Sequence, residues 1–355
     1  MTILVLDTRA GDRVSDLFVL SEGGEQQRRL RLGYVPELCY DAATHELVLA
    51  ETSLGSRFRH ETQYWLKGYD ASTWDLKWKQ LTAERPMYTG YPGRSSNIDV
   101  CASGRFVYSL QSRMLIRSTE DPSASDTFHL TVTRYDRRRG LLESGQSAID
   151  SCTVAFGYLG PGVDQVYFHL SCDYPSTVAF CDFADPEINW VRMDPLTQRD
   201  FSPRETCGSW LDPARRRLYC VAGNGTVYEV SHAPSRSTVF ACIELGADEL
   251  IPLRQIHGNG EFLFVGVSGD SNLRSLSLAS EICQIAIANP DAVRRFPLPF
   301  PVLNFVASGD GRLIAGTSPY QQAVCLLDAS NGRVIRILEP VGMTPAEVLF
   351  VEEHS

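Results

Sequence analysis

Glu37-Leu-Cys-Tyr-Asp-Ala-Ala-Thr-His-Glu-Leu-Val-Leu-Ala50 is the stretch that decides the fold. It places two short apolar runs on either side of a polar turn centred near Ala43. β-Branched and aromatic runs bounded by Gly, Asp, Asn and Pro are typical of strands joined by tight turns. The stretch therefore predicts a β-hairpin, and almost none of the remaining chain has the periodicity of a helix.

The same unit recurs along the chain. After Ala43, further turns fall near Ser103, Gly162, Pro213, Asn259 and Asp310, so the gaps between successive turns are 60, 59, 51, 46 and 51 residues. A period of about 40–50 residues with four strands per unit is typical of β-propeller blades. A second hairpin completes most units, as in 323–336, where an Asn-Gly pair is a strong two-residue turn signal.

The two ends of the chain predict one more blade. The tail strand Glu347–Glu352 is expected to pair with strands Ile3–Asp7 and Ser15–Leu20, which closes a ring and removes exposed sheet edges. Seven blades in 355 residues give about 51 residues each, in agreement with the observed gaps. We therefore expect one all-β domain, residues 1–355, folded as a seven-bladed β-propeller of four-stranded blades.

Composition excludes several classes of partner. The chain has 33 Lys and Arg against 43 Asp and Glu, a formal charge of −10. Nucleic-acid binding is not expected, because neutralising phosphates requires clustered Lys and Arg. The short basic runs at 28–31, 137–139 and 215–217 are interpreted as solvated turns. No stretch approaches 18 apolar residues, so no membrane partner is expected either.

The beginning of the sequence and its cysteines predict a cytoplasmic protein without cofactors. Residues 1–7 have no basic region, and Asp7 interrupts the apolar run, unlike in a signal peptide. In a reducing compartment the ten cysteines are expected to be buried thiols. No cysteines have C-x-x-C spacing and no histidines have H-E-x-x-H spacing, so we expect no metal site.

Several segments, in order along the chain, resemble a known family. These are Leu32-Gly-Tyr-Val-Pro, Tyr64-Trp-Leu-Lys-Gly-Tyr-Asp-Ala-Ser-Thr, Thr89-Gly-Tyr-Pro92 and the final repeat Asn304–Leu338 with its Asp328-Ala-Ser-Asn-Gly-Arg turn. They are similar to segments of the heavy, β-propeller subunit of methylamine and aromatic amine dehydrogenases.

This resemblance implies an architecture and a ligand funnel. Cys152 and Cys172 resemble two cysteines that form a disulfide in periplasmic members of the family. The family's tryptophan tryptophylquinone cofactor belongs to a separate light subunit, and nothing in this sequence is able to carry it. Members are exported, whereas this chain shows no export signal. The fold alone does not specify a reaction.

Candidate site residues follow from the loops that lead into the innermost strand of each predicted blade. The candidate acid/base groups are the carboxylates Glu37, Glu205, Glu249 and Glu347. The candidate substrate-binding residues are Tyr34, Tyr91, Asn97, Asp150, Arg254, Phe300 and Asn304. Convergent carboxylates with aromatic walls suit a cationic amine on an apolar body. Crowding of carboxylates also raises some of their pKa values, as acid/base catalysis requires.

These residues predict an enzyme that condenses an aromatic amine, such as a tryptophan derivative, with an aldehyde. The Pictet–Spengler reaction needs no cofactor, and strictosidine-synthase-type propellers perform it with a glutamate as acid/base. Such a role belongs to natural-product biosynthesis, with a small-molecule amine and an aldehyde as partners. Two alternatives remain: a non-catalytic heavy subunit that binds a quinone-bearing light subunit, and a propeller that serves only as a protein-interaction scaffold.

Overall fold

The computed structural model describes residues 1–9, 14–54, 61–86, 98–115, 127–149, 152–158, 165–171, 177–182, 188–189, 206–212, 214–215, 217–231, 236–252, 255–269 and 277–352. Within these residues every regular element is a β-strand, which confirms the all-β prediction. None of the described elements is a helix with the length and apolar character needed to cross a membrane.

The chain divides into two compact units. The first unit comprises Met1–Arg31, Tyr174–Ser176 and Arg192–Ser355, and the second comprises Leu32–Asp173 and Thr177–Val191. Both are built from antiparallel sheets whose strands follow one another in chain order. The exception is one sheet of the first unit, in which the last strand of the chain lies beside the first.

The second unit holds three sheets. Their strands are β3 (Gln26–Asp41, from Leu32 onward), β4 (Glu46–Leu54), β5 (Glu61–Asp70) and β6 (Leu76–Pro86); β7 (Ile98–Ser103), β8 (Phe106–Leu115), β9 (Thr127–Asp136) and β10 (Leu141–Ile149); and β11 (Cys152–Tyr158), β12 (Gln165–Ser171), β13 (Thr177–Asp182) and β14 (Ile188–Asn189). Cys172, and with it the pairing of Cys152 and Cys172, lies outside the described residues.

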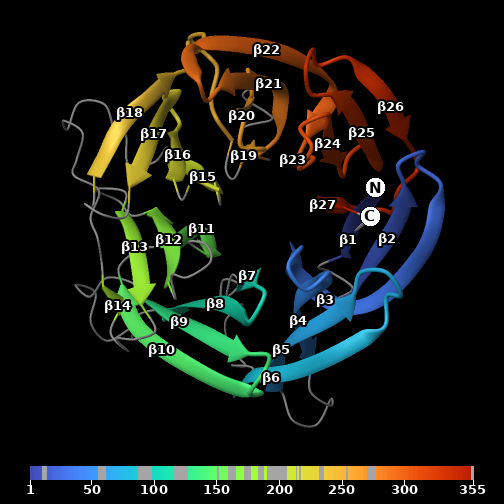
Figure 1. Cartoon of the computed structure of the whole chain (residues 1–355), viewed down its shortest axis with the longest axis vertical. Coiled ribbons are helices and arrows are strands. Elements are labelled where there is room, and N and C mark those ends of the chain that lie inside the picture. The colour runs from blue at the N-terminus through green and yellow to red at the C-terminus, as the bar shows by residue number, and fades with distance from the viewer. Residues whose placement is uncertain are drawn as a thin grey trace. The chain divides into compact units, whose positions relative to one another are not determined.

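The first unit holds three four-stranded sheets and a terminal one. Their strands are β15 (Thr206–Asp212), β16 (Arg217–Ala222), β17 (Thr226–Ser231) and β18 (Arg236–Cys242); β19 (Ile256–Gly258), β20 (Phe262–Val267), β21 (Ala279–Ala286) and β22 (Asn289–Val302); β23 (Asn304–Ala307), β24 (Leu313–Ser318), β25 (Ala323–Asp328) and β26 (Val334–Leu338); and β27 (Pro345–Val351), β1 (Thr2–Arg9) and β2 (Val14–Ser21). The strands β15, β19, β23 and β27 follow one another side by side (Figure 1).

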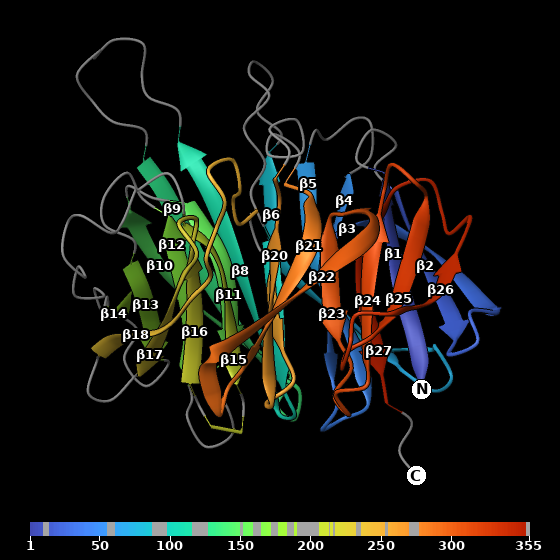
Figure 2. The ribbon, with the colours of Figure 1, turned by 90° about the horizontal axis from the view of Figure 1, so that it is seen from above.

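The terminal sheet joins the two ends of the chain. β27 pairs antiparallel with β1, with Thr2 opposite Val351 and Val5 opposite Val348. The start of β1 and the end of β27 therefore lie at the same end of the first unit (Figure 2). The predicted pairing of the N- and C-terminal strands is confirmed. β3 follows β2 in this sheet and continues into the first sheet of the second unit.

Neighbouring sheets pack face to face in both units. In the first unit, three apolar clusters lie between successive sheets, with Val265, Leu326 and Phe305 among their buried members. In the second unit, Val48 and Leu66 pack against Val107 of the next sheet. This arrangement explains the continuous apolar runs of strands such as β1 and β2, because a sheet packed between two neighbours buries both of its faces.

Aspartates close many of the hairpins by a common pattern. Asp70, Asp136 and Asp328 each accept backbone N–H groups two or three residues further on. Four residues after each of them the chain has a positive φ, at Trp74, Gly140 and Gly332. Aspartate side chains favour such turns because they bond to their own backbone. A share of the acidic residues counted in the sequence therefore has a local structural role.

Asp41 extends this pattern into a network between two sheets of the second unit. Its carboxylate accepts the N–H of Gly104, at the β7–β8 turn, at 2.8 Å, and it binds the guanidinium of Arg137 after β9. Arg137 also donates to Thr44 Oγ1 at 3.0 Å and pairs with Glu46 at 3.3 Å. Since the side chains of Arg137 and Asp41 are 9% and 4% exposed, this is a buried charge network.

His257 makes the corresponding link between two sheets of the first unit. Its Nδ1 accepts the N–H of Ala307 on the neighbouring strand β23 at 3.2 Å. The ring lies beside Trp210, with centroids 6.2 Å apart. Burial lowers the pKa of His257 to about 4, from 6.5. The imidazole is therefore neutral at neutral pH, and protonating Nδ1 would remove the acceptor of this hydrogen bond.

We expect mild acid to destabilise the first unit through His257. The folded pKa lies below the unfolded value of 6.5, so the unfolded state binds the proton first, and stability is lost as the pH falls from 6.5 towards 4. At pH 5.5 the free energy of unfolding should be lower than at pH 7.5 by about 1.4 kcal/mol from this group. Urea unfolding at both pH values measures the difference. His257→Gln should remove it, and an unchanged pH dependence in that variant would contradict the assignment.

Candidate functional site

The described candidate residues fall into two groups, one in each unit. Tyr34 and Glu37 belong to the second unit. The candidates of the first unit are Glu249, Phe300, Asn304 and Glu347. The remaining candidates lie outside the described residues: Tyr91, Asn97, Asp150, Glu205 and Arg254.

Tyr34 and Glu37 point to the same face of the first sheet of the second unit. Tyr34 lies opposite Thr52 and Glu37 opposite Ala50, with a β-bulge between the two pairs. Because Thr52 and Ala50 are two residues apart on β4, their side chains and those of their partners share one face. Pro36 lies within the bulge, where its missing N–H costs no ladder hydrogen bond.

Tyr64 completes this cluster. It lies opposite Thr52 on β5, so Tyr34, Thr52 and Tyr64 form one row across three strands. Opposed side chains in such a row have Cβ atoms about 5 Å apart. Tyr64 is partly buried and packs against the apolar core of the second unit. We call Tyr34, Glu37, Thr52 and Tyr64 the tyrosine–carboxylate cluster.

The electrostatics of the tyrosine–carboxylate cluster favour a protonated phenol beside a carboxylate. Burial, and to a lesser degree the charge of Glu37, raise the pKa of Tyr34 above its usual value. The phenol therefore keeps its proton and remains able to donate a hydrogen bond. Tyrosine rings attract cations over their faces, and a carboxylate binds an ammonium directly. The cluster thus provides the chemical groups that an aromatic ammonium ligand requires.

Asn304 and Glu347 are brought close together in the first unit. Thr317 Oγ1 lies 3.3 Å from the carbonyl oxygen of Asn304 and 3.2 Å from that of Ala346, the residue before Glu347. Thr317 is fully buried, so this hydroxyl fixes β23 and β27 beside each other. These two candidates therefore lie on or beside the neighbouring strands β23 and β27.

Glu249 and Phe300 are engaged in contacts within the first unit. The carboxylate of Glu249 accepts the N–H of Gly246 at 2.6 Å and pairs with Arg295 at 2.8 Å. The Arg295 guanidinium and this N–H hold the pKa of Glu249 below its usual range. Such a group stays charged at neutral pH, which suits holding a cation better than delivering a proton. Phe300, on β22, is partly buried and packs against an apolar core cluster of the first unit.

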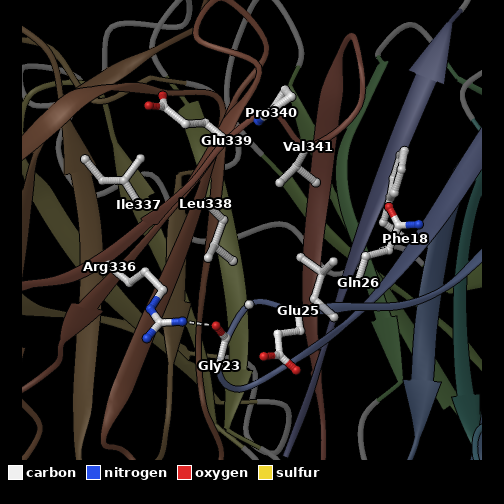
Figure 3. Close-up of a pocket in the computed structure, with 12 residues that line it drawn as sticks. Phe18, Gly23, Glu25, Gln26, Arg336, Ile337, Leu338, Glu339, Pro340 and Val341 are labelled. Carbon is white, nitrogen blue, oxygen red and sulfur yellow. Dashed lines mark hydrogen bonds between the residues drawn. The ribbon is translucent and has the colours of Figure 1, made fainter.

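A groove in the first unit is a feature that sequence reasoning missed. Its floor is apolar, and Phe18, Leu20, Leu338 and Val341 contribute to it. Glu25, Gln26, Arg336, Ile337, Glu339 and Pro340 lie around the rim (Figure 3). The volume is about 450 Å³. The Arg336 guanidinium donates to the carbonyl of Gly23, which ties β26 to the β2–β3 turn (Figure 3). The lining segments lie more than 300 residues apart in the chain, so no local pattern predicts the groove.

Within the described part of the chain, no three His, Cys, Asp or Glu side chains gather closely enough to hold a metal ion.

Solved structures similar to this chain share its fold at low sequence identity. They include a candidate 6-phosphogluconolactonase of Bacteroides fragilis, with a TM-score of 0.62, 10% identity and coverage of 99% of this chain and 98% of that one. The Cps50 (Swd1) β-propeller domain of Myceliophteria thermophila gives a TM-score of 0.59, 13% identity and 88% coverage of both chains. Saccharomyces cerevisiae Sqt1 gives 0.57 and 13% identity, with coverage of 94% and 82%.

No family profile and no curated protein sequence matches the chain. The TM-scores establish a similar fold, but at identities of 10–13% they say nothing about activity. The chain thus has the sheet architecture of β-propeller proteins.

Proposed function

We propose that the sheets are seven blades of one closed ring, in a single domain related to the heavy subunit of amine dehydrogenases. Two observations support this proposal. β27 pairs with β1, so one blade takes strands from both ends of the chain. β3 is the last strand of that sheet and the first strand of the next, so the seven-stranded sheet counts as two blades of four that share one strand.

We further propose that the tyrosine–carboxylate cluster binds an aromatic amine, which the protein condenses with an aldehyde in the cytoplasm. The observation that carries this proposal is the row of Tyr34, Thr52 and Tyr64 with Glu37 on the same face. Glu37 would hold the ammonium group while the tyrosine rings flank the aromatic body.

The reaction requires only acid/base groups and positioning. The amine nitrogen adds to the aldehyde carbonyl, and loss of water gives an iminium ion. The arene then attacks the iminium carbon to form the C–C bond, and a carboxylate accepts the ring proton that is released. A positioned carboxylate contributes about 10²–10⁴-fold to such a proton transfer. Glu37 is the described carboxylate best placed beside the aromatic row.

The first test is binding of tryptamine by calorimetry. Tyr34→Ala and Glu37→Gln should each weaken binding at least tenfold, which corresponds to about 1.4 kcal/mol, because they remove an aromatic wall and the ammonium partner. Tyr320→Ala is the matched control, since this tyrosine is 61% exposed in the first unit. Equal affinities for all four proteins would contradict the amine site.

The second test is turnover. Tryptamine and acetaldehyde should give the cyclised amine faster than the uncatalysed background, as measured by mass spectrometry. Binding without turnover across a panel of aldehydes would contradict the condensation and retain the amine site. The heavy-subunit role, with its light-subunit partner, and the scaffold role stay predictions.

A further inference from the structure

Exposed apolar side chains are concentrated in one short span of the first unit. Among the described residues, eight large apolar side chains are exposed, and five of them lie between residues 320 and 343. Three of the five are on a single strand, β26: Val334, Ile335 and Ile337, which are 39%, 49% and 41% exposed. Scattered single exposed residues are normal, whereas adjacent exposed apolar residues on one face, such as Ile335 and Ile337, are typical of an interaction surface.

β26 is also the last strand of its sheet. It pairs with β25, with Ile337 opposite Cys325 and Arg336 opposite Leu326, and the described residues provide no partner for its other edge. A strand in this position presents a row of N–H and C=O groups to solvent, which is a template for pairing with another chain. Edge strands are commonly protected by charged residues, but β26 carries three exposed β-branched apolar residues.

The charge on β26 specifies what such a strand would accept. Arg336 is the single charged residue of β26 and lies between Ile335 and Ile337. Across a strand pair, opposite charges and apolar β-branched pairs are stabilising, whereas like charges are not. The complementary segment therefore places an acidic residue opposite Arg336 and apolar residues on either side of it.

We propose that β26 binds an extended segment of a partner protein by β-strand addition, with an acidic residue between two β-branched residues at its centre. Backbone hydrogen bonds provide the affinity in this mode, and pockets for alternate side chains provide the specificity. The groove beside β26, lined by Arg336, Ile337 and Leu338, is such a pocket (Figure 3).

A second copy of this chain fits the strand less well. Arg336 is the middle residue of β26. In an antiparallel pair of two β26 strands, the two Arg336 side chains would therefore lie opposite each other or within two positions of each other. Arg333 at the preceding turn adds a further positive charge to each side. Like charges in this arrangement destabilise the pair, so the charge pattern favours an acidic partner over self-association.

The test uses a pair of synthetic peptides and the whole chain. The acidic probe is acetyl-Ser-Thr-Val-Glu-Val-Thr-Ser-amide and its counterpart carries Lys in place of Glu. Fluorescence anisotropy of labelled peptides should show at least tenfold tighter binding of the acidic peptide. A version with N-methyl groups on alternate backbone nitrogens should lose binding at least tenfold, because it keeps the side chains and removes the donors. Equal binding of the acidic and Lys peptides, unchanged binding of the N-methylated version, or no saturable binding would overturn the proposal.

Variants separate this surface from general effects on folding. Arg336→Glu should reverse the preference towards the Lys peptide, a change that mere loss of folding does not produce. Arg312→Glu is the matched control, because Arg312 is 72% exposed and directly precedes β24, which β25 separates from β26. Ile335→Lys should weaken binding at least tenfold, whereas Val239→Lys on the edge strand β18 should not. Sedimentation velocity tests for self-association of the chain. If the chain self-associates and Ile335→Lys abolishes this, β26 mediates contact between copies and the proposal is overturned.

Discussion

Arg137→Ala should lower the free energy of unfolding of the second unit by about 3–5 kcal/mol. The guanidinium pairs with Asp41 and Glu46 and donates to the carbonyl of Gly104 at the turn of the next sheet. Removing it leaves the Asp41 carboxylate, whose side chain is only 4% exposed, without its positive partner, whereas Glu46 keeps its ion pair with Lys77 at 3.0 Å. A buried charge without its counter-ion is costly, because the Asp41 carboxylate has lost its hydration and keeps only its hydrogen bonds from Gly104, Ala43 and Thr44. Urea unfolding monitored by tryptophan fluorescence measures the loss.

Two further variants isolate the cause. Arg139→Ala is the matched control, since its side chain is 71% exposed and its ion pair with Asp136 is 3.9 Å long, so the expected change is below about 1 kcal/mol. Arg137→Met keeps apolar contact with the Trp78 ring, whose centroid is 5.8 Å from the guanidinium carbon, but leaves the Asp41 carboxylate without its cation. If Arg137→Met is as stable as the parent protein, packing rather than charge accounts for the effect and the argument from unpaired charge fails.

The network around Arg137 also shows what sequence reasoning reaches and what it does not. Arg137–Arg139 was interpreted as a solvated turn, and the turn itself is correct, because Asp136 accepts the N–H groups of Arg138 and Arg139. The burial of Arg137 was not predictable, since its partner Asp41 lies 96 residues earlier in the chain. Local turn chemistry is encoded within five residues, whereas the partner of a charge depends on which sheets become neighbours.

The same distinction explains the candidate site. The strand repeat and the pairing of the termini were predictable, because strand alternation and turn residues are local signals repeated many times. The candidate residues were expected on loops, but Tyr34 and Glu37 lie within β3 and Phe300 lies within β22, and the contacts of their side chains were not predictable. Glu249 meets Arg295, 46 residues away, and Tyr64 joins Tyr34 through the register of β3, β4 and β5. Register and β-bulges decide which side chains share a face, and a one-residue shift of a strand moves each of its side chains to the opposite face.

Gly225→Ala should destabilise the first unit by about 3 kcal/mol, the second large effect that the structure predicts. Gly225 forms the β16–β17 turn, which the sequence Asn224-Gly-Thr226 predicts, and its φ is +88°. An added Cβ would lie 2.3 Å from the carbonyl oxygen of Ile243. This oxygen belongs to the backbone, and the N–H of Ile243 is itself bound to the carbonyl of Gly225 at 2.8 Å. A backbone oxygen yields less readily than the end of a flexible side chain, so steric overlap adds to the cost of a left-handed backbone.

Gly260→Ala separates these two costs within the same unit. Gly260 has a similar φ of +83°, but the nearest atom to an added Cβ is the end of the Arg215 side chain at 3.8 Å. Only the backbone term remains there, about 1–2 kcal/mol. The difference between the two variants in urea unfolding therefore measures the steric term, for which we expect about 1–3 kcal/mol. Equal losses for both variants would show that the Ile243 carbonyl yields to the methyl group, and that the β16–β17 turn is held less firmly than its hydrogen bonds indicate.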